Sequence, residues 1–403
     1  MNGQLSRRLR LARFFMATPA RRQTLLRLGI VNSLCIPYYR RYGRGISSFP
    51  ANVTIYPTFR CNQNCLMCMQ TSSRKTVHER PPWYDPKREL PVEKWAAFFD
   101  QIRSFRPILL IFGGEPLLYP QFKELIREAK KRRLWVHLVT NGTLLPDLAD
   151  FLVEQGVEGV AISLDGPPAI HDLIRGVNGA FNLASAGAKA LIEARRRQKK
   201  SGPMLGFSFT ITKHNYEGMH DAIEYAISLN ADAFWACHAC FKTTDMVQRH
   251  NAIFSESYAA AMGIQMDFPS IREGNYYQSD MEPEDIPKLT EVLNKARQMV
   301  KGRIDFVLEP QLTDDLLAPF YLDMDFPFVQ KCDFLWRTFP VQPDGRVSPC
   351  LNFVAGNITE QSVAEIWNGK LMQRLREMFA DNLVVGCTRC SNRHYVRASR
   401  CLA

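Results

Sequence analysis

The sequence predicts an α/β fold in which a partial (β/α)6 barrel of the TIM type is followed by a small α+β domain. One observation predicts the barrel: from residue 51 onwards, six short β-rich segments alternate with amphipathic helical segments. This order is typical of a parallel sheet covered by helices. A second observation predicts the separate domain, because the chain after about residue 329 is rich in turn residues and holds its own group of cysteines.

The barrel strands are expected where β-branched and aromatic residues gather between turn residues. The predicted strands are 52–59, 108–113, 135–141, 159–165, 205–212 and 233–239. The predicted helices between them are 92–102, 122–132, 145–155, 180–197 and 216–229. In such sheets the functional side chains lie at the carboxyl ends of the strands, so catalytic and binding residues are expected there.

Four regions follow from this pattern. We expect a basic amphipathic arm over residues 1–50 and a barrel core over residues 51–242. Residues 243–328 are expected to form a helical linker that completes the barrel, with a polar stretch at 266–284 as a candidate lid. The C-terminal domain is expected over residues 329–403.

The positive charge of the chain is concentrated in the arm. The net charge is +11, but residues 1–45 hold ten arginines and no acidic residue, which leaves 41 basic against 40 acidic residues in the rest. A nucleic-acid partner is therefore not expected for the body. Helices predicted over 7–17 and 21–41 place Leu, Phe, Ile and Tyr between the arginines. Such an arm binds an anionic membrane surface, binds an acidic partner, or packs back on its own domain.

The cysteine content indicates metal binding in a reducing compartment. Eleven cysteines are an odd number, and seven of them fall into two groups, which is not typical of a secreted disulfide framework. The N-terminus lacks the apolar core of a signal peptide, and no apolar run approaches the roughly 20 residues that cross a bilayer. We therefore expect a cytoplasmic protein, with peripheral membrane attachment through the arm as an option.

Three cysteines directly follow the first predicted strand. Cys61, Cys65 and Cys68 have the spacing C-x3-C-x2-C within the segment FRCNQNCLMCMQ. A structural zinc site or a saturated iron-sulfur cluster takes four protein ligands. With three thiolates, a [4Fe-4S] cluster keeps one iron open for an exchangeable ligand. The alternative is a zinc loop that borrows a distant histidine.

At this point the chain resembles the radical S-adenosylmethionine (radical SAM) superfamily. Its cysteine loop has this spacing, and further motifs occur in the expected order at predicted strand ends: GGEP at 113–116, TNGT at 140–143 and SLDG at 163–166, followed by HDLIRG at 171–176. The resemblance implies that SAM binds the open iron through its amino nitrogen and carboxylate.

The resemblance also implies roles for residues around SAM. The carbonyls of Gly113 and Gly114, with the Glu115 carboxylate, would accept from the SAM ammonium, while Pro116 stiffens the turn. The guanidinium of Arg175 would donate hydrogen bonds to the SAM carboxylate.

Short polar groups at the other strand ends suit the ribose hydroxyls of SAM. These are Asn141, Ser163 and Asp165, although Asn-Gly and Asp-Gly pairs are also ordinary turn formers. The position before the third cysteine is often aromatic in the superfamily, and here it is Met67. Its backbone is expected to face the adenine without a stacking contact.

The second group of cysteines comprises Cys332, Cys350, Cys387 and Cys390. Two close C-x2-C pairs, as in a zinc ribbon, are absent. The layout resembles the auxiliary cluster modules of radical SAM enzymes, the SPASM domain and the shorter twitch domain. Only Cys401 follows, so a twitch-like or truncated SPASM module with one fully ligated [4Fe-4S] cluster is expected. Such a cluster moves an electron or is purely structural.

Two further cysteines form a C-x2-C pair, Cys237 and Cys240. If the predicted strand runs through both, they point to opposite faces and cannot chelate together, so core positions are expected. A thiol that points into the barrel would be able to exchange a hydrogen atom with the substrate, and Cys240 is our candidate for that catalytic role. Cys35 is expected to be a buried apolar position of the arm.

Together these features predict an enzyme that cleaves SAM reductively, with electrons from a reductant such as flavodoxin or ferredoxin. The 5′-deoxyadenosyl radical would then abstract hydrogen from an unactivated carbon, leading to dehydrogenation or bond formation. The arm favours a lipid-like or membrane-associated substrate. The alternatives are a ribosomal peptide, an RNA, or no reaction at all in a metal-binding scaffold.

Overall fold

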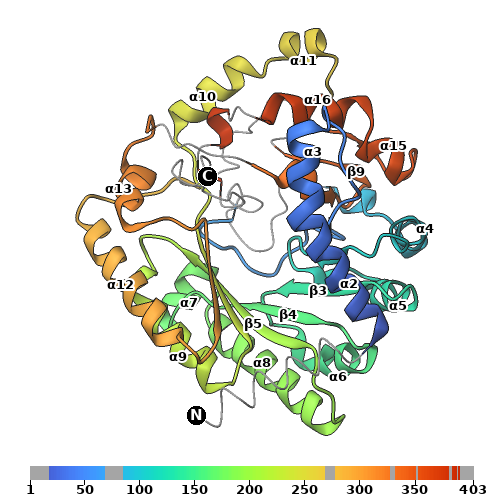
Figure 1. Cartoon of the computed structure of the whole chain (residues 1–403). Coiled ribbons are helices and arrows are strands. Elements are labelled where there is room, and N and C mark those ends of the chain that lie inside the picture. Colours follow the sequence, from blue (N-terminus) through green and yellow to red (C-terminus); the bar gives the residue numbers. More distant parts are fainter. Residues whose placement is uncertain are drawn as a thin grey trace.

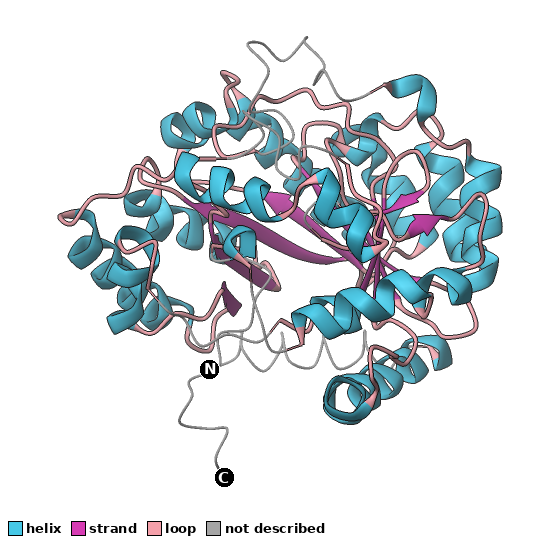
Figure 2. Cartoon of the chain, turned by 90° about the horizontal axis from the view of Figure 1, so that it is seen from above, coloured by secondary structure: helices cyan, strands magenta, loops and turns pink. Residues whose placement is uncertain are grey.

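The computed structural model describes residues 18–68, 85–267, 277–326, 332–350, 353–380, 384–387 and 389–390. Strands lie in the interior with helices around them, as Figure 2 shows. This is the mixed α/β, mostly parallel architecture that the sequence predicts. The predicted helix at 7–17 and part of the candidate lid lie outside the described residues.

One sheet runs through the molecule. Within the described residues it has ten strands in the order β10-β9-β8-β1-β2-β3-β4-β5-β6-β7. The strands are β1 (Asn52–Ile55), β2 (Ile108–Ile111), β3 (Trp135–Thr140), β4 (Gly159–Ser163), β5 (Met204–Ile211), β6 (Ala233–His238), β7 (Asp305–Glu309), β8 (Thr338–Val341), β9 (Arg346–Val347) and β10 (Gly356–Asn357). Strands β8 and β1 to β7 pair in parallel, whereas β9 and β10 are antiparallel.

Five barrel helices lie in the predicted segments between the strands, and α7 (Pro168–Arg175) is an additional helix that the sequence did not indicate. In the barrel the helices are α4 (Val92–Ile102), α5 (Phe122–Lys131), α6 (Leu145–Gln155), α7, α8 (Ala180–Arg197) and α9 (Met219–Ser228). Those that follow are α10 (Thr244–Ile253), α11 (Glu256–Met262), α12 (Asp285–Val300), α13 (Asp314–Leu322), α14 (Phe334–Arg337), α15 (Val363–Trp367) and α16 (Lys370–Phe379).

Four of the described strands, β7 to β10, lie outside the six predicted segments, and two of them extend the barrel sheet. β7 extends the barrel beyond six strands by pairing with β6. Its sequence DFVLE begins and ends with acidic residues, so its apolar signal is short. β8 belongs to the C-terminal region but pairs in parallel with β1. The barrel and the C-terminal region therefore share one sheet.

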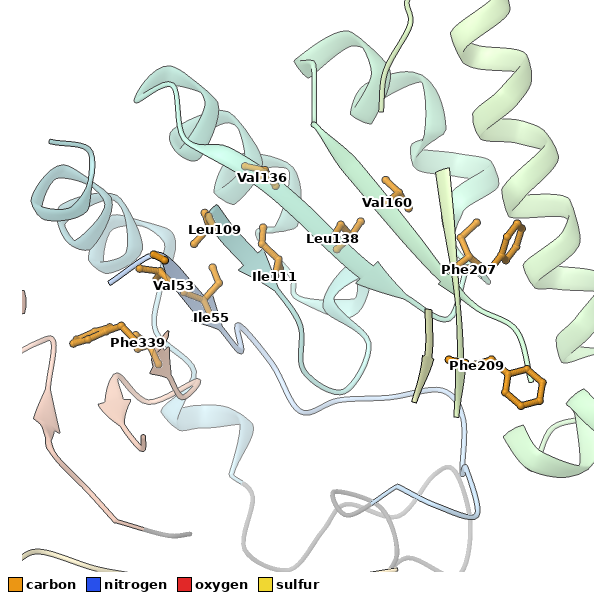
Figure 3. Close-up of a cluster of buried hydrophobic side chains, with 14 of the residues drawn as sticks. Val53, Ile55, Leu109, Ile111, Val136, Leu138, Val160, Phe207, Phe209 and Phe339 are labelled. Carbon is orange, nitrogen blue, oxygen red and sulfur yellow. The ribbon is translucent and has the colours of Figure 1, made fainter. Parts of the chain in front are cut away.

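The core is built from alternate residues of neighbouring strands. Val53 pairs with Leu109, and Ile55 with Ile111, and all four side chains have no exposed surface. Figure 3 shows them beside equivalent side chains of β3, β4 and β5. Each such burial contributes about 1.5–3 kcal/mol. This packed layer gives the loops at the carboxyl ends of the strands a firm base.

The described part of the arm packs on the body. It consists of α2 (Pro19–Ile30), the π-helical segment Val31–Cys35 and α3 (Ile36–Tyr42), which together form one continuous blue rod in Figure 1. Its inner side chains are buried: Thr24, Leu28, Val31 and Ile36. Of the alternatives that the sequence left open for the arm, the structure therefore shows packing on its own domain for this segment. No helix in the described ranges is long and apolar enough to cross a membrane.

Candidate active site

The loop that carries the first three cysteines leaves β1 and lies directly against the end of β2. The backbone N–H groups of Gly114 and Glu115 donate to the carbonyls of Thr58 (3.0 Å) and Arg60 (2.7 Å). A Cβ atom on Gly113 or Gly114 would collide with these same two carbonyl oxygens. Gly113 also has a φ of 145°, which disfavours other residues. The two glycines thus let the cysteine loop approach the second strand.

Helix α7 holds the other side of the loop. The N–H groups of Asn64 and Leu66 donate to the carbonyls of Arg175 (3.0 Å) and Ile174 (2.9 Å). Cys65 lies between these two hydrogen bonds. The last turn of α7 therefore fixes the backbone on both sides of the central cysteine.

The end of β3 supplies a third support. Asn141 donates from Nδ2 to Oδ1 of Asn62 (2.7 Å), and Asn62 donates from Nδ2 to Oγ1 of Thr143 (2.8 Å). The cysteine loop is consequently bound to the GGEP, TNGT and HDLIRG segments at once. Asn62 is a site residue that the sequence did not indicate, since the C-x3-C spacing specifies no residue type between the first two cysteines.

The thiols of Cys61, Cys65 and Cys68 are close enough to act on one another electrostatically. Burial raises the pKa of Cys61 to about 12, and the thiolates of Cys65 and Cys68 add to this. Burial also raises the pKa of Cys65 to about 11, against the lowering effect of Arg175. Three partly buried thiols this close hold negative charge only with a cation between them, which fits an iron-sulfur cluster.

A cluster and a single metal ion require different spacings of their ligands. No three His, Cys, Asp or Glu side chains of the described residues are grouped as ligands of one ion. In a cluster each thiolate binds a different iron atom, so its ligands are more widely spaced than those of a zinc ion. Cys61, Cys65 and Cys68 are free cysteines that form no disulfide in the described part of the chain.

Arg175 lies between the cysteine loop and the end of β4. Its Nη2 is 2.5 Å from Oδ2 of Asp165, a residue with no exposed surface, and its Nη1 is 3.6 Å from Sγ of Cys65. The Nε atom of this buried guanidinium has no hydrogen-bond partner in the described part of the chain. Asp165 also accepts from the N–H of Thr210 (2.8 Å). The two predicted SAM residues are thus partners of each other.

Glu115 is buried and joins the ends of β2 and β3. Its Oε1 accepts from the Thr140 hydroxyl (2.8 Å) and from the N–H of Leu117 (3.1 Å), and its Oε2 accepts from the N–H of Asn141 (2.7 Å). An ionised carboxylate has about four acceptor positions, so one remains at Oε2. Burial raises the pKa of Glu115 to about 7, although these donors act in the opposite direction.

The remaining predicted positions also lie at this edge of the sheet. Ser163 is the buried last residue of β4. Pro116 opens the short 3-10 turn Pro116–Leu118 after β2. Met67 is partly exposed in the turn directly before Cys68. No hydrogen bond of these side chains identifies a SAM contact, so their roles stay predictions.

The four C-terminal cysteines come together in space. The side chain of Cys387 is hydrogen-bonded to the thiol of Cys350 and raises the pKa of Cys350. Burial and the nearby thiols of Cys390 and Cys332 raise this pKa as well. The N–H of Cys390 donates to the carbonyl of Cys387 (3.1 Å), which is typical of a tight C-x2-C turn. Four thiols from three chain segments suit one fully ligated cluster.

The condition under which Cys237 and Cys240 would point to opposite faces, a strand through both, is not met. β6 ends at His238, so Cys240 lies beyond the strand and the argument from opposite strand faces does not apply. Cys237 is 3.7 Å from the hydroxyl of Thr210, and burial raises its pKa to about 11, with a smaller effect of Asp165 in the same direction. Cys237 is thus the thiol placed near Asp165. A catalytic role for Cys240 stays a prediction.

Comparison with known proteins agrees with this arrangement. The family model described as the radical SAM superfamily matches residues 55–226, and the SPASM model, described as an iron-sulfur cluster-binding domain, matches residues 332–391. Both resemblances seen in the motifs are thereby confirmed.

Two relatives illustrate the range of the similarity. The AdoMet-dependent heme synthase of Methanosarcina barkeri is 29% identical over 79% of this chain and 83% of its own length. The PqqA peptide cyclase of Ruegeria pomeroyi is 33% identical over 77% of this chain and 71% of its own length. Among solved structures, Streptococcus suis SuiB bound to S-adenosylmethionine matches with a TM-score of 0.58 at 16% identity, over 88% of this chain and 75% of that chain. This last likeness shows the fold.

Proposed function

Since this chain belongs to the radical SAM superfamily and carries a SPASM domain, we propose that it oxidises an unactivated carbon of its substrate. It is an enzyme, and its cofactors are a [4Fe-4S] cluster with SAM and an auxiliary iron-sulfur cluster. The chemistry supplied by the bound cluster and SAM is reductive cleavage of SAM and removal of a hydrogen atom from the substrate.

One observation carries the proposal: the three-thiol loop is bound to the ends of β2 and β3 and to α7. Cys61, Cys65 and Cys68 would hold three irons of the cluster and leave the fourth to SAM. The free acceptor position on Glu115 suits the SAM ammonium. The unpartnered Nε of Arg175 suits an acceptor group such as the SAM carboxylate.

The auxiliary cluster suits an oxidative outcome. Cys332, Cys350, Cys387 and Cys390 would fill all four ligand positions, so this cluster binds no substrate and can take up an electron. In a dehydrogenation, the substrate would lose one hydrogen atom to the SAM fragment, then one proton to solvent and one electron to this cluster. Delivery of the first electron requires an external reductant, for which flavodoxin and ferredoxin are our candidates.

A peptide is the substrate class that we favour, on the similarity to one peptide-modifying relative. The PqqA peptide cyclase is 33% identical over 77% of this chain. The AdoMet-dependent heme synthase, 29% identical over 79% of this chain, is a relative with a different product. The similarities give no support to the lipid-like substrate expected from the arm. A membrane-associated substrate is kept as a second candidate on one observation, the row of exposed apolar side chains on the arm. No finding supports RNA modification.

A substrate test follows from this choice. Reconstituted enzyme, SAM and dithionite would be incubated without oxygen with the peptide fraction and, separately, the lipid fraction of the same cells. Mass spectrometry would search each for a compound that loses two hydrogen atoms or gains a crosslink. The Cys65→Ala variant is the control. A product in the peptide fraction alone supports the proposal, and a product in the lipid fraction alone contradicts the peptide assignment.

A further inference from the structure

The outer face of the arm carries an unbroken row of exposed apolar side chains. Leu26, Ile30, Leu34, Tyr38 and Tyr42 occur at every fourth residue and are between 55% and 69% exposed. We propose that this row, with the arginines beside it, is a docking surface for a membrane that contains anionic lipids. The inference concerns the arm alone and does not depend on the chemistry of the barrel.

The helix geometry keeps the row on one side. In an α-helix a step of four residues exceeds a full turn by about 40°, so a long row at this spacing would wind around the helix. The π-helical segment Val31–Cys35 lies in the middle of the row and holds more residues per turn. It therefore rotates the following side chains back, and Tyr38 and Tyr42 stay exposed like Leu26. The row from Leu26 to Tyr42 is about 24 Å long.

The inner face of the arm is fixed to the body. Arg27 donates to the carbonyl of Pro50 (3.1 Å), Arg40 to that of Ala380 (2.7 Å), and Arg337 to Oδ1 of Asn32 (2.9 Å). Together with the buried inner side chains, these bonds give the rod one orientation. The helix that carries the exposed row is therefore already ordered before it binds a partner. A free amphipathic segment would have to fold on binding.

The charges beside the row favour an anionic surface. Arg22, Arg41 and Arg44 are exposed, and residues 18–50 contain no acidic side chain. Arginine near an anionic membrane contributes about 1 kcal/mol each, and tyrosines settle at the interface between headgroups and acyl chains. A second copy of the chain would bring the same arginines face to face, which disfavours a symmetric dimer.

Vesicle sedimentation tests this inference without SAM or substrate. The full-length protein would be mixed with vesicles of phosphatidylcholine alone or with phosphatidylglycerol added. The test variant is Leu34→Glu/Tyr38→Glu, whose side chains are 65% and 59% exposed. The matched control is Leu183→Glu, because Leu183 is 45% exposed on α8, outside the arm. Circular dichroism would verify that all three proteins are folded.

We expect the wild type and the Leu183→Glu variant to bind phosphatidylglycerol vesicles and to release them at high salt. The arm variant should lose at least about tenfold in affinity, since it gains two negative charges and loses two apolar contacts. Equal binding of the arm variant and the wild type would overturn the proposal, as would no binding to anionic vesicles. Light scattering that shows a wild-type dimer and a monomeric arm variant would assign the face to a second copy instead.

Discussion

The Nη1 atom of Arg175 lies 3.6 Å from the Sγ atom of Cys65, while its Nη2 atom is paired with Asp165. A guanidinium beside a thiolate stabilises negative charge on the sulfur. A cluster held by Cys65 becomes more negative when it is reduced, and hydrogen bonds to its sulfurs are one of the factors that set its potential. Arg175 is therefore placed to make the reduction of this cluster easier.

Arg175→Lys should make the reduction potential of the three-cysteine cluster more negative. Lysine keeps the positive charge beside Asp165 but has no second nitrogen to donate to the sulfur of Cys65. A hydrogen bond to a charged group contributes about 1.5–3 kcal/mol, so we expect a shift of up to roughly 130 mV for a one-electron couple. An anaerobic redox titration followed by electron paramagnetic resonance measures it. Leu173→Lys, at an exposed position of the same helix, should leave the potential unchanged; an equal shift in both would refute a specific role for Arg175.

Glu115→Gln should destabilise the protein before any cofactor is added. The amide nitrogen cannot accept a hydrogen bond, so either Asn141 or the Thr140 and Leu117 pair loses a buried acceptor. The expected loss is about 1–3 kcal/mol, measured by chemical denaturation of the metal-free protein. The matched change Glu93→Gln, at an exposed position of α4, should have almost no effect. A stable Glu115→Gln protein would contradict the role of this carboxylate in joining β2 and β3.

Cys350→Ala should remove one cluster and keep the other. The reconstituted wild type should hold about eight irons per chain and the variant about four. Cleavage of SAM should persist, whereas oxidation of the substrate should stop, because its last electron has no acceptor. Iron analysis and product analysis measure the two effects separately, with Cys35→Ala as the control. If the variant keeps eight irons, Cys350 is not a cluster ligand.

The protein should lose stability in mild acid. Burial lowers the pKa of His238 to about 3 and that of His250 to about 4, and both side chains are fully buried. In the unfolded chain histidine binds its proton near pH 6.5. Between pH 6.5 and 4 the unfolded state therefore holds more protons, so the free energy of unfolding falls as the pH falls. The slope is at most about 1.4 kcal/mol per pH unit for each histidine.

Chemical denaturation at several pH values measures this slope. His250→Phe removes one titrating group next to Phe254 and should flatten the dependence between pH 6.5 and 4. His214, which is exposed, provides the control variant His214→Gln. A His250→Phe protein with the slope of the wild type would show that the buried histidine is not responsible.

Much of the site could be predicted because its motifs stand at strand ends. Parallel strands deliver their carboxyl ends to one edge, so the positions of Cys61, Gly114, Asn141 and Ser163 in the chain already implied that they meet. The sequence did not show which residues of different loops bind to each other. Each residue of the Arg175 and Asp165 pair was expected to bind SAM by itself, and the hydrogen bonds of Asn62 follow no spacing rule.

The fold, like the site, could be predicted only in part. Strong apolar periodicity identified the first six strands and five of the helices around them, but not α7. β7 was missed because Asp305–Glu309 has charged ends, and the pairing of β8 with β1 joins segments far apart in the chain. β6 ends at His238, one residue before the predicted end, so the condition of a strand through both Cys237 and Cys240 is not met. Local patterns cannot show such tertiary contacts.

The central claim is that Cys61, Cys65 and Cys68 hold a cluster that cleaves SAM. The most direct measurement is 5′-deoxyadenosine formed from SAM and dithionite under anaerobic conditions, by reconstituted wild type and by Cys65→Ala. We predict product from the wild type and none from the variant. Equal product from both proteins, or none from a fully iron-loaded wild type even with cell extract added, would contradict the claim.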